Sequence, residues 1–218
     1  MLVFYLHSGH VSTTVDSIME LFEDTSLIQG SPAWKAARRR RIGGTAISAI
    51  MGVNKYKTRL ELFEQMTGQR DEPDIGHLPH VRRGVDAEPV ARRLVEKWLD
   101  VKYTTPVVVD PEFDYMVASL DGLTDDHTLE IKTGSMQAHQ DARIGVIPYM
   151  YRLQCQWGMM VSGMDRCLYV SYRPEDESIH HVWIERNDVM IADMRQAAIE
   201  FWAMVESGEW VEGYTYVD

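Results

Sequence analysis

MVASLDGLTDDHTLEIKT, residues 116–133, predicts two short strands joined by a polar turn. The first strand would span 116–120 and end immediately before Asp121, and the second would span 128–132. The second strand alternates apolar with charged residues, and a period of two is typical of a strand that is buried on one face. The stretch therefore predicts a hairpin whose second strand is half buried.

The charged face of this hairpin carries Glu130 and Lys132, which would lie roughly 6–7 Å apart along the strand. Asp121, at the end of the partner strand, can reach the same patch. Two carboxylates and a lysine that converge at a sheet edge suit a hard divalent cation held by oxygen ligands. A glutamate and a lysine two residues apart are more often a solvated face, so this pattern alone leaves both interpretations open.

The composition is that of a soluble globular protein, and 218 residues suit one domain with a sizeable core. No apolar run approaches the ~20 residues of a membrane span, and the first residues lack the basic segment of a signal peptide. We therefore expect a cytoplasmic protein with no membrane partner. The two cysteines, Cys155 and Cys167, are too few for a disulfide framework, a zinc site or an iron–sulfur cluster.

The charges are unevenly distributed along the chain. The net charge is −11, but residues 32–102 carry 15 Lys and Arg against 9 Asp and Glu, a local excess of +6. Residues 173–218 carry 3 basic against 11 acidic side chains, a balance of −8. This asymmetry permits a basic phosphate-binding face on an acidic protein, although long-range attraction to DNA would be modest.

Periodicity and turn residues predict the remaining elements. Pro89 lies inside one predicted helix, and because proline is tolerated only in the first turn or at a kink, Asp86 is the expected N-cap there. We expect an N-terminal extension (1–30), a mixed α/β core around one central sheet (31–185), and a C-terminal helix with a tail (186–218), all in one domain. The predicted helices are 15–22, one that begins at Pro32 after the N-cap Ser31, 46–51, 58–67, 82–99, 147–161 and 187–206, and the other predicted strands are 107–109, 166–172 and 179–185.

Five separated motifs occur in a fixed order along the chain. They are Trp34 with Arg38, Gly84 with Glu88, Ser119-Leu120-Asp121-Gly122, Glu130-Ile131-Lys132 and Gln154-Cys155-Gln156. These motifs resemble those of the phage-lambda-type (YqaJ-like) alkaline exonucleases, which belong to the PD-(D/E)XK nuclease superfamily, and the resemblance covers about residues 34–185. The resemblance implies a restriction-endonuclease-like core, in which helices flank a central mixed sheet.

The resemblance implies a site for two Mg²⁺ ions, which Mn²⁺ could replace. Asp121, Glu130 and the main-chain carbonyl of Ile131 would hold the first ion, and Glu88 would help to hold the second. Lys132 would orient or deprotonate the attacking water. Gln154 would hydrogen-bond around that lysine and fix its direction. Two such ions suit the in-line displacement of a phosphodiester.

The resemblance also implies a pocket for a terminal 5′-phosphate, formed by Arg38, Thr45 and Ser119. Thr45 stands where the family usually has serine, and the preceding Ile-Gly-Gly departs from the usual sequence. Leu78 and Val81 are candidates for the wedge that separates the strands of the duplex end.

The implied activity is a 5′→3′ exonuclease on ends of double-stranded DNA, in a ring-shaped homotrimer that works with a phage single-strand annealing protein. An endonuclease or single-strand nuclease of the same superfamily, or a non-catalytic DNA-binding protein on that fold, are the alternatives. Simpler interpretations also exist for single residues. Glu88 could pair with Arg92 at i+4, and Gln154 could be an ordinary polar residue on the exposed face of its helix.

Overall fold

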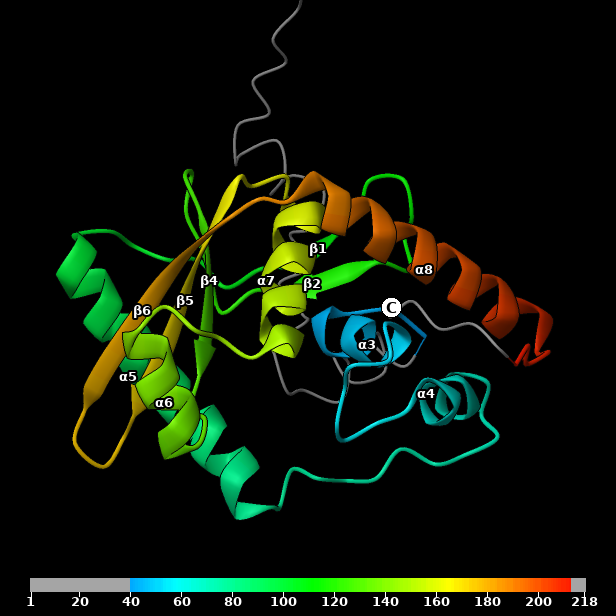
Figure 1. Ribbon diagram of the computed structural model, residues 1–218, viewed down its shortest axis with the longest axis horizontal. Helices are drawn as coiled ribbons and strands as arrows, with labels where there is room; N and C mark the ends of the chain where they lie inside the picture. The colour runs from blue at the N-terminus through cyan, green and yellow to red at the C-terminus, as the bar shows by residue number, and fades with distance from the viewer. Residues whose placement is uncertain (1–39, 213–218) are drawn as a thin grey trace, which may run out of the picture.

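The computed structural model describes residues 40–212 of the chain. The helices predicted over 15–22 and from Pro32, together with Trp34 and Arg38, lie outside the described residues. Six strands are distributed over two sheets (Figure 1). They are β1 (Val107–Val109), β2 (Val117–Ser119), β3 (Gly122–Leu123), β4 (Thr128–Lys132), β5 (Arg166–Arg173) and β6 (Ser178–Glu185).

Six helices accompany the strands in the described part of the chain. None of them is both long enough and apolar enough to cross a membrane. They are α3 (Gly44–Ile50), α4 (Arg59–Met66), α5 (Pro79–Leu99), α6 (Met136–Arg143), α7 (Tyr149–Ser162) and α8 (Asp188–Ser207).

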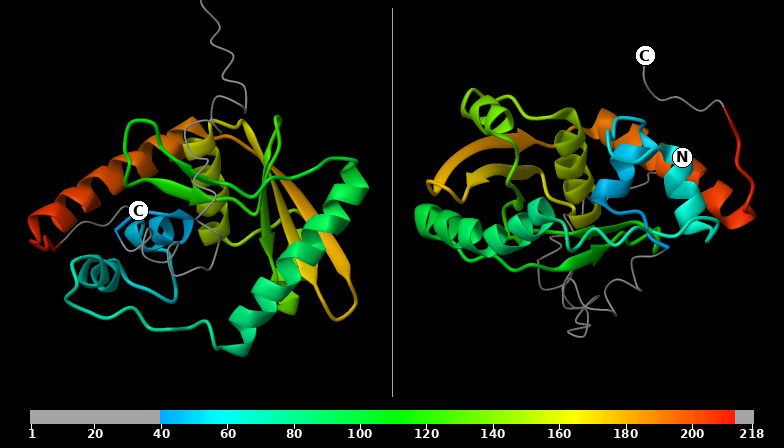
Figure 2. Two further views of the ribbon diagram at one scale, coloured as in Figure 1. Left: turned by 180° about the vertical axis from the view of Figure 1, so that it is seen from behind. Right: turned by 90° about the horizontal axis from the view of Figure 1, so that it is seen from below.

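The larger sheet is four-stranded and mixed, with the order β3-β4-β5-β6. Strands β4 and β5 are parallel, and the other neighbours are antiparallel. Helix α5 covers one face of this sheet, and α6 and α7 cover the other (Figure 2). Alternate residues of β5 divide between the two faces, since Leu168 clusters with Ala91 of α5 and Tyr169 with Met159 of α7. The predicted mixed sheet flanked by helices is confirmed.

The predicted hairpin between 116–120 and 128–132 is wrong. Strand β2 pairs with β1 in a separate two-stranded sheet and not with β4. The antiparallel neighbour of β4 is the two-residue strand β3. The chain changes sheets at Leu120-Asp121. Alternation along a strand shows which residues share a face, but it does not identify the neighbouring strand.

The prediction for α5 was also wrong at its N-terminus. The helix begins at Pro79 with Leu78 as its N-cap, so Asp86 caps nothing and Pro89 lies in the helix interior. Pro79 suits the first position, where its missing N–H costs no hydrogen bond. Packing of Ala87 and Ala91 against the sheet stabilises the helix across Pro89.

Most other predictions agree with the structure to within a few residues. Helix α4 follows the N-cap Thr58 and has a capping box, because the Thr58 side chain and Glu61 satisfy each other's main-chain N–H groups. Helix α8 ends at Gly208 in the left-handed conformation. Helix α6 was not predicted.

The largest core cluster lies between the two sheets and α8. It contains buried side chains of α3, α4, α7 and α8, together with β1 and β2. The indole N–H of Trp157 on α7 donates a hydrogen bond to the Val117 carbonyl of β2 at 2.8 Å, which fixes the two-stranded sheet against this helix. Helix α7 therefore contacts both sheets and holds them in one arrangement.

Candidate active site

Asp121 lies where the chain passes from one sheet to the other. Leu120 still donates its N–H to Pro106, next to β1, at 3.1 Å, whereas Gly122 already pairs with Leu129 of β4. The Asp121 Oδ2 atom accepts a hydrogen bond of 2.7 Å from the main-chain N–H of Ile131. The structure thus brings Asp121 to the centre of the Glu130-Ile131-Lys132 triplet, as the sequence predicted, by a different strand pairing.

Gly122 is required at this crossing for steric reasons. A Cβ atom there would lie 2.6 Å from the ring of Tyr103 and 2.9 Å from Cβ of Leu129, closer than real Cβ contacts. The Tyr103 hydroxyl is in turn hydrogen-bonded to His127 Nε2 at 2.5 Å. The Asp-Gly pair of the motif is therefore explained by packing, since a larger residue would displace the main chain beside Asp121.

Glu130 and Lys132 are not a solvated face. Their side chains form an ion pair and are 13% and 26% exposed. The Lys132 Nζ atom lies 5.4 Å from the ring centroid of Tyr151 on α7. The charged face of β4 is therefore directed towards α7 and is largely removed from water.

Lys132 is a protonated amine in this arrangement. Burial by itself would lower the pKa of the amine, but the Glu130 and Asp121 carboxylates outweigh burial and raise the pKa above its usual value. The charged form can donate hydrogen bonds and offset negative charge. It cannot accept a proton until it has lost its own.

Glu88 reaches the site from α5. It forms an ion pair with Arg92, one turn further along the helix. The i+4 pair that the sequence offered as the simpler interpretation of Glu88 is therefore present. The pair is not a surface feature, because the two side chains are only 21% and 18% exposed. Arg92 Nε also donates a hydrogen bond to the main-chain carbonyl of Asp121. Glu88 and Asp121 are thus connected through one guanidinium group.

The three carboxylates influence one another electrostatically. Burial, followed by the charges of Glu130 and Glu88, raises the pKa of Asp121 to about 8. Burial also raises the pKa of Glu88, and the Glu130 charge adds to this effect while Arg92 and Lys132 oppose it. Carboxylates that resist ionisation beside one another are a donor set that a divalent cation would stabilise.

The residues 40–212 contain no group of three or more His, Cys, Asp or Glu side chains arranged to hold a metal ion. Glu130 and Glu88 are directed instead to Lys132 and Arg92. The oxygen donors fit Mg²⁺ in their chemistry, since it prefers carboxylates and carbonyls and keeps several waters. In this structure Lys132 and Arg92 bind the carboxylates of Glu130 and Glu88, which would otherwise be available to a metal ion.

The two glutamines of the Gln-Cys-Gln motif are both buried on α7 and differ in what they contact. Gln156 binds main-chain groups on both sides of the β6–α8 junction, donating to the Glu185 carbonyl and accepting from the Asn187 N–H, each at 2.8 Å. Gln154 packs beside Gly44 at the start of α3. No hydrogen bond joins Gln154 to Lys132 among the described residues, so its expected role around the lysine stays a prediction.

The predicted phosphate pocket can be examined at two of its three residues. Thr45 is exposed on α3, and a bridge between Ile42 and Met116 brings the start of α3 alongside β2. The Ser119 Oγ atom is buried and has no hydrogen-bond partner within residues 40–212. A buried hydroxyl without a partner is unusual and is consistent with a ligand position. The wedge candidates Leu78 and Val81 lie at the first turn of α5.

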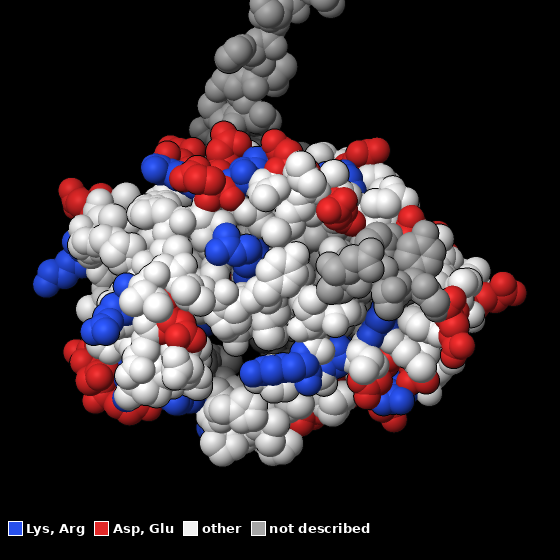
Figure 3. All heavy atoms as spheres, in the orientation of Figure 1, with Lys and Arg blue, Asp and Glu red and all other residues white. Residues whose placement is uncertain are grey.

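Charged side chains of both signs lie on the face shown in Figure 3, and they are mixed along its margins. Lys and Arg atoms lie next to a hollow near the middle of this face, and many Asp and Glu atoms lie nearer its margins. The sequence has a local basic excess in residues 32–102 although its net charge is −11.

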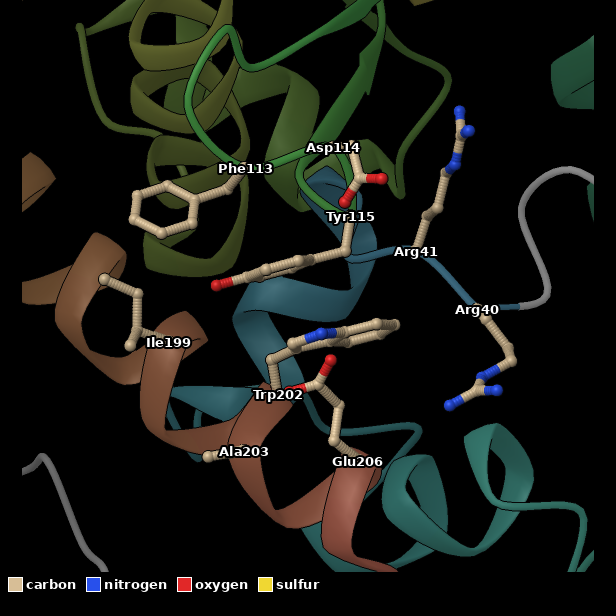
Figure 4. A pocket seen from close by; sticks show the side chains of 9 residues that line it. All are labelled: Arg40, Arg41, Phe113, Asp114, Tyr115, Ile199, Trp202, Ala203 and Glu206. Atoms are coloured by element: carbon tan, nitrogen blue, oxygen red, sulfur yellow. The ribbon is translucent and has the colours of Figure 1, made fainter.

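A pocket of about 600 Å³ lies between α8 and the β1–β2 connection, and none of the predicted metal ligands lines it (Figure 4). Its wall includes Tyr115 and Trp202, whose rings are stacked at 4.5 Å. The Arg40 guanidinium lies 5.8 Å from the Trp202 ring. Arg40 is the first described residue, so the pocket borders the part of the chain that the structure does not describe.

The sequence interpretation missed the contributions of Arg92 and Tyr151 to the site. The sequence indicated Arg92 only as a possible i+4 partner of Glu88, and it indicated no role in the site for Tyr151. The signal for Arg92 was its i+4 spacing from Glu88. Both residues directly follow small apolar residues, Ala87 and Ala91, on the same helix. For Tyr151 the signal was its spacing of three from Gln154.

The chain is similar to known proteins in sequence and in fold. The model of the YqaJ-like viral recombinase domain matches residues 33–165. A curated relative, the uncharacterized protein YqaJ of Bacillus subtilis (strain 168), is 28% identical over 176 residues, which cover 78% of this chain and 54% of the relative. The chain thus spans about half the length of this relative.

Solved structures with a similar fold include two of an alkaline exonuclease, LHK-Exo, from Laribacter hongkongensis. The first has a TM-score of 0.71 and 26% identity, and covers 82% of this chain and 94% of that protein. The second, of LHK-Exo in complex with dAMP, has a TM-score of 0.70 at the same identity and coverage. A phage-related exonuclease from Haemophilus somnus 129PT has a TM-score of 0.56 at 14% identity, covers 77% of this chain and 96% of that protein, and supports the fold alone.

Proposed function

Because the chain belongs to the family of YqaJ-like viral recombinase domains, we propose that it is an Mg²⁺-dependent exonuclease. It resects linear double-stranded DNA in the 5′→3′ direction and leaves 3′ single-stranded tails for phage homologous recombination by strand annealing. The observation that carries this proposal is the hydrogen bond between Asp121 and the main chain of Ile131, which joins the Asp-Gly motif to the Glu130-Ile131-Lys132 motif. The alkaline exonuclease fold supports it.

In the proposed mechanism, Asp121, Glu130 and the Ile131 carbonyl would hold one Mg²⁺, and Glu88 would help to hold a second. When bound, the two ions supply positive charge to the attacking and leaving oxygens of the phosphodiester. Lys132 is protonated beside these carboxylates. It therefore donates to the scissile phosphate or orients the attacking water, and it offsets charge that develops on the phosphate.

The choice of DNA end is proposed to depend on Arg38, Thr45 and Ser119. A terminal 5′-phosphate carries more charge than an internal phosphodiester, and a guanidinium can bind its oxygens in a bidentate manner. The buried Ser119 Oγ atom has no partner in the described residues and supplies a free donor for such a phosphate. Thr45 retains the hydroxyl that the family pattern has at its position.

The first experiment measures nucleotide release from linear and covalently closed duplex DNA, with Mg²⁺ and with EDTA. We expect release from linear duplex only, dependent on Mg²⁺, and faster from 5′-phosphorylated than from 5′-hydroxyl ends. Cleavage of closed circles would identify an endonuclease, and release from single strands alone would identify a single-strand nuclease. Binding without any release would indicate a non-catalytic DNA-binding protein.

We also propose a ring-shaped homotrimer that threads DNA and acts with a phage single-strand annealing protein. A threaded ring should remain processive at salt concentrations that weaken its loading, because counterion release governs the initial phosphate contacts. Light scattering should give a mass of about three times the 25.1 kDa of the chain. A monomer that is nevertheless highly processive would contradict the ring.

A further inference from the structure

The peptide group between Asp121 and Gly122 lies where the chain passes from one sheet to the other. Residues up to Leu120 belong with the two-stranded sheet, and residues from Gly122 belong with β4. A buried carbonyl at such a crossing needs a partner from elsewhere in the molecule. Arg92 of α5 supplies it, since its Nε atom donates to the Asp121 carbonyl.

The same guanidinium binds Glu88 through a second nitrogen. The Nη2 atom of Arg92 donates to the Glu88 carboxylate, and both side chains are about one-fifth exposed. The guanidinium is planar and its donors point in fixed directions, so binding one partner determines the direction of the other hydrogen bond. The Glu88 carboxylate and the Asp121 carbonyl are therefore held in a fixed orientation relative to each other.

The position of α5 makes this connection rigid. Ala87 and Ala91, the residues immediately before Glu88 and Arg92, pack against the four-stranded sheet in a cluster with Leu129 and Ile131. Glu88 and Arg92 thus border a buried stripe of the helix. Two of the five N–H donors of the Arg92 guanidinium are thus directed to the two acidic residues.

We propose that Arg92 is a positioning residue that fixes the spacing between the Glu88 and Asp121 carboxylates before a divalent cation binds. The inference rests on the proposed metal-dependent function. Arg92 touches neither substrate nor metal, and acts through the two acidic residues. Partners that orient metal ligands typically change metal affinity by about 10–100-fold when they are removed.

The test measures binding of Mn²⁺ alone, without DNA, by isothermal titration calorimetry. Arg92→Ala should bind Mn²⁺ about 10–100-fold more weakly than the wild type. Arg92→Lys keeps the charge but cannot reproduce the planar fork, so its affinity should lie between the two. Arg93→Ala is the matched control, because Arg93 is the next residue of the same helix and is exposed, and it should bind as the wild type does.

Thermal unfolding in EDTA separates positioning from a general loss of structure. A cooperative transition in Arg92→Ala together with weakened Mn²⁺ binding supports the inference. Wild-type or tighter affinity in a folded Arg92→Ala overturns it, and tighter binding would mean that the arginine merely competes with the cation. If the alanine variant does not fold, Arg92→Lys decides, and wild-type affinity there overturns the inference.

The wild-type titration distinguishes this inference from the proposed function. If the wild-type protein binds no Mn²⁺ at all, the metal-dependent nuclease itself is overturned, and the role of Arg92 with it. If the wild type binds Mn²⁺ and the Arg92 variants bind it equally well, only the positioning role is overturned.

Discussion

Replacement of Asp121 by Asn should abolish nucleotide release from linear duplex DNA. The change removes a negatively charged ligand from the centre of the site but keeps an oxygen that can accept the Ile131 hydrogen bond. The loss should exceed the ~10–100-fold change that is typical of removing an outer partner of a metal site. Nuclease assays over a range of Mg²⁺ concentrations measure it, with Asp125→Asn, a change at an exposed residue of the β3–β4 connection, as the control.

The same variant should have the opposite effect on the stability of the metal-free protein. The pKa of Asp121 is about 8 in the fold, above the ~3.9 of an unfolded aspartate. Folding therefore favours the protonated carboxyl, whose stabilising contribution is complete below about pH 4 and is lost as the pH rises towards 8. In EDTA, the melting temperature of Asp121→Asn should exceed that of the wild type increasingly from pH 5 to pH 8. Normal nuclease rates in this variant would rule out Asp121 as a metal ligand.

Replacement of Lys132 by Ala should reduce the rate of cleavage by about 10²–10⁴-fold, the range for a residue that assists the chemical step. DNA binding in Ca²⁺, which supports binding without turnover, should be retained. The reason is that the amine interacts with Glu130 and Tyr151 inside the site and serves the reacting phosphate in the proposed mechanism. Single-turnover rates and fluorescence anisotropy measure the two properties separately.

Lys102→Ala is a suitable control for this experiment, since Lys102 is an 89% exposed lysine that pairs with Glu96 outside the site. Both properties should be unchanged in it. If Lys132→Ala lost DNA binding together with turnover, the lysine would be a phosphate anchor or a structural residue. That result would remove it from the chemical step.

The convergence of Asp121, Glu130 and Lys132 could be predicted because it depends on local rules. Alternation along β4 determines which side chains share a face, and Asp-Gly marks the end of the preceding strand. The pairing of that strand could not be predicted, because it depends on Pro106 and β1, which contact it from elsewhere in the chain. The sequence thus brought these three residues together through an incorrect hairpin, and their role as a metal site stays a prediction.

Helix α6 shows why some elements escape prediction from sequence. Its residues, MQAHQDAR, are mostly polar and short of large apolar side chains, so the segment lacks the apolar stripe by which the other helices were predicted. The helix is held by contacts that are distant in sequence, since His139 is buried and lies 3.0 Å from both the Ser171 and the Ser178 hydroxyls. The N-cap Ser135, whose side chain accepts from the Ala138 N–H, was a local signal that could have been used.

Pro89 has a consequence for the residue that precedes it. A proline in a helix interior has no N–H to donate to the carbonyl four residues earlier, here that of Val85, and its ring crowds that carbonyl. The turn that carries Glu88 is therefore held by fewer main-chain hydrogen bonds than the turns on either side, and small local openings cost less free energy there. The ion pair of Glu88 with Arg92 and the packing of Ala87 against the sheet therefore hold this turn in place where main-chain hydrogen bonds are fewer.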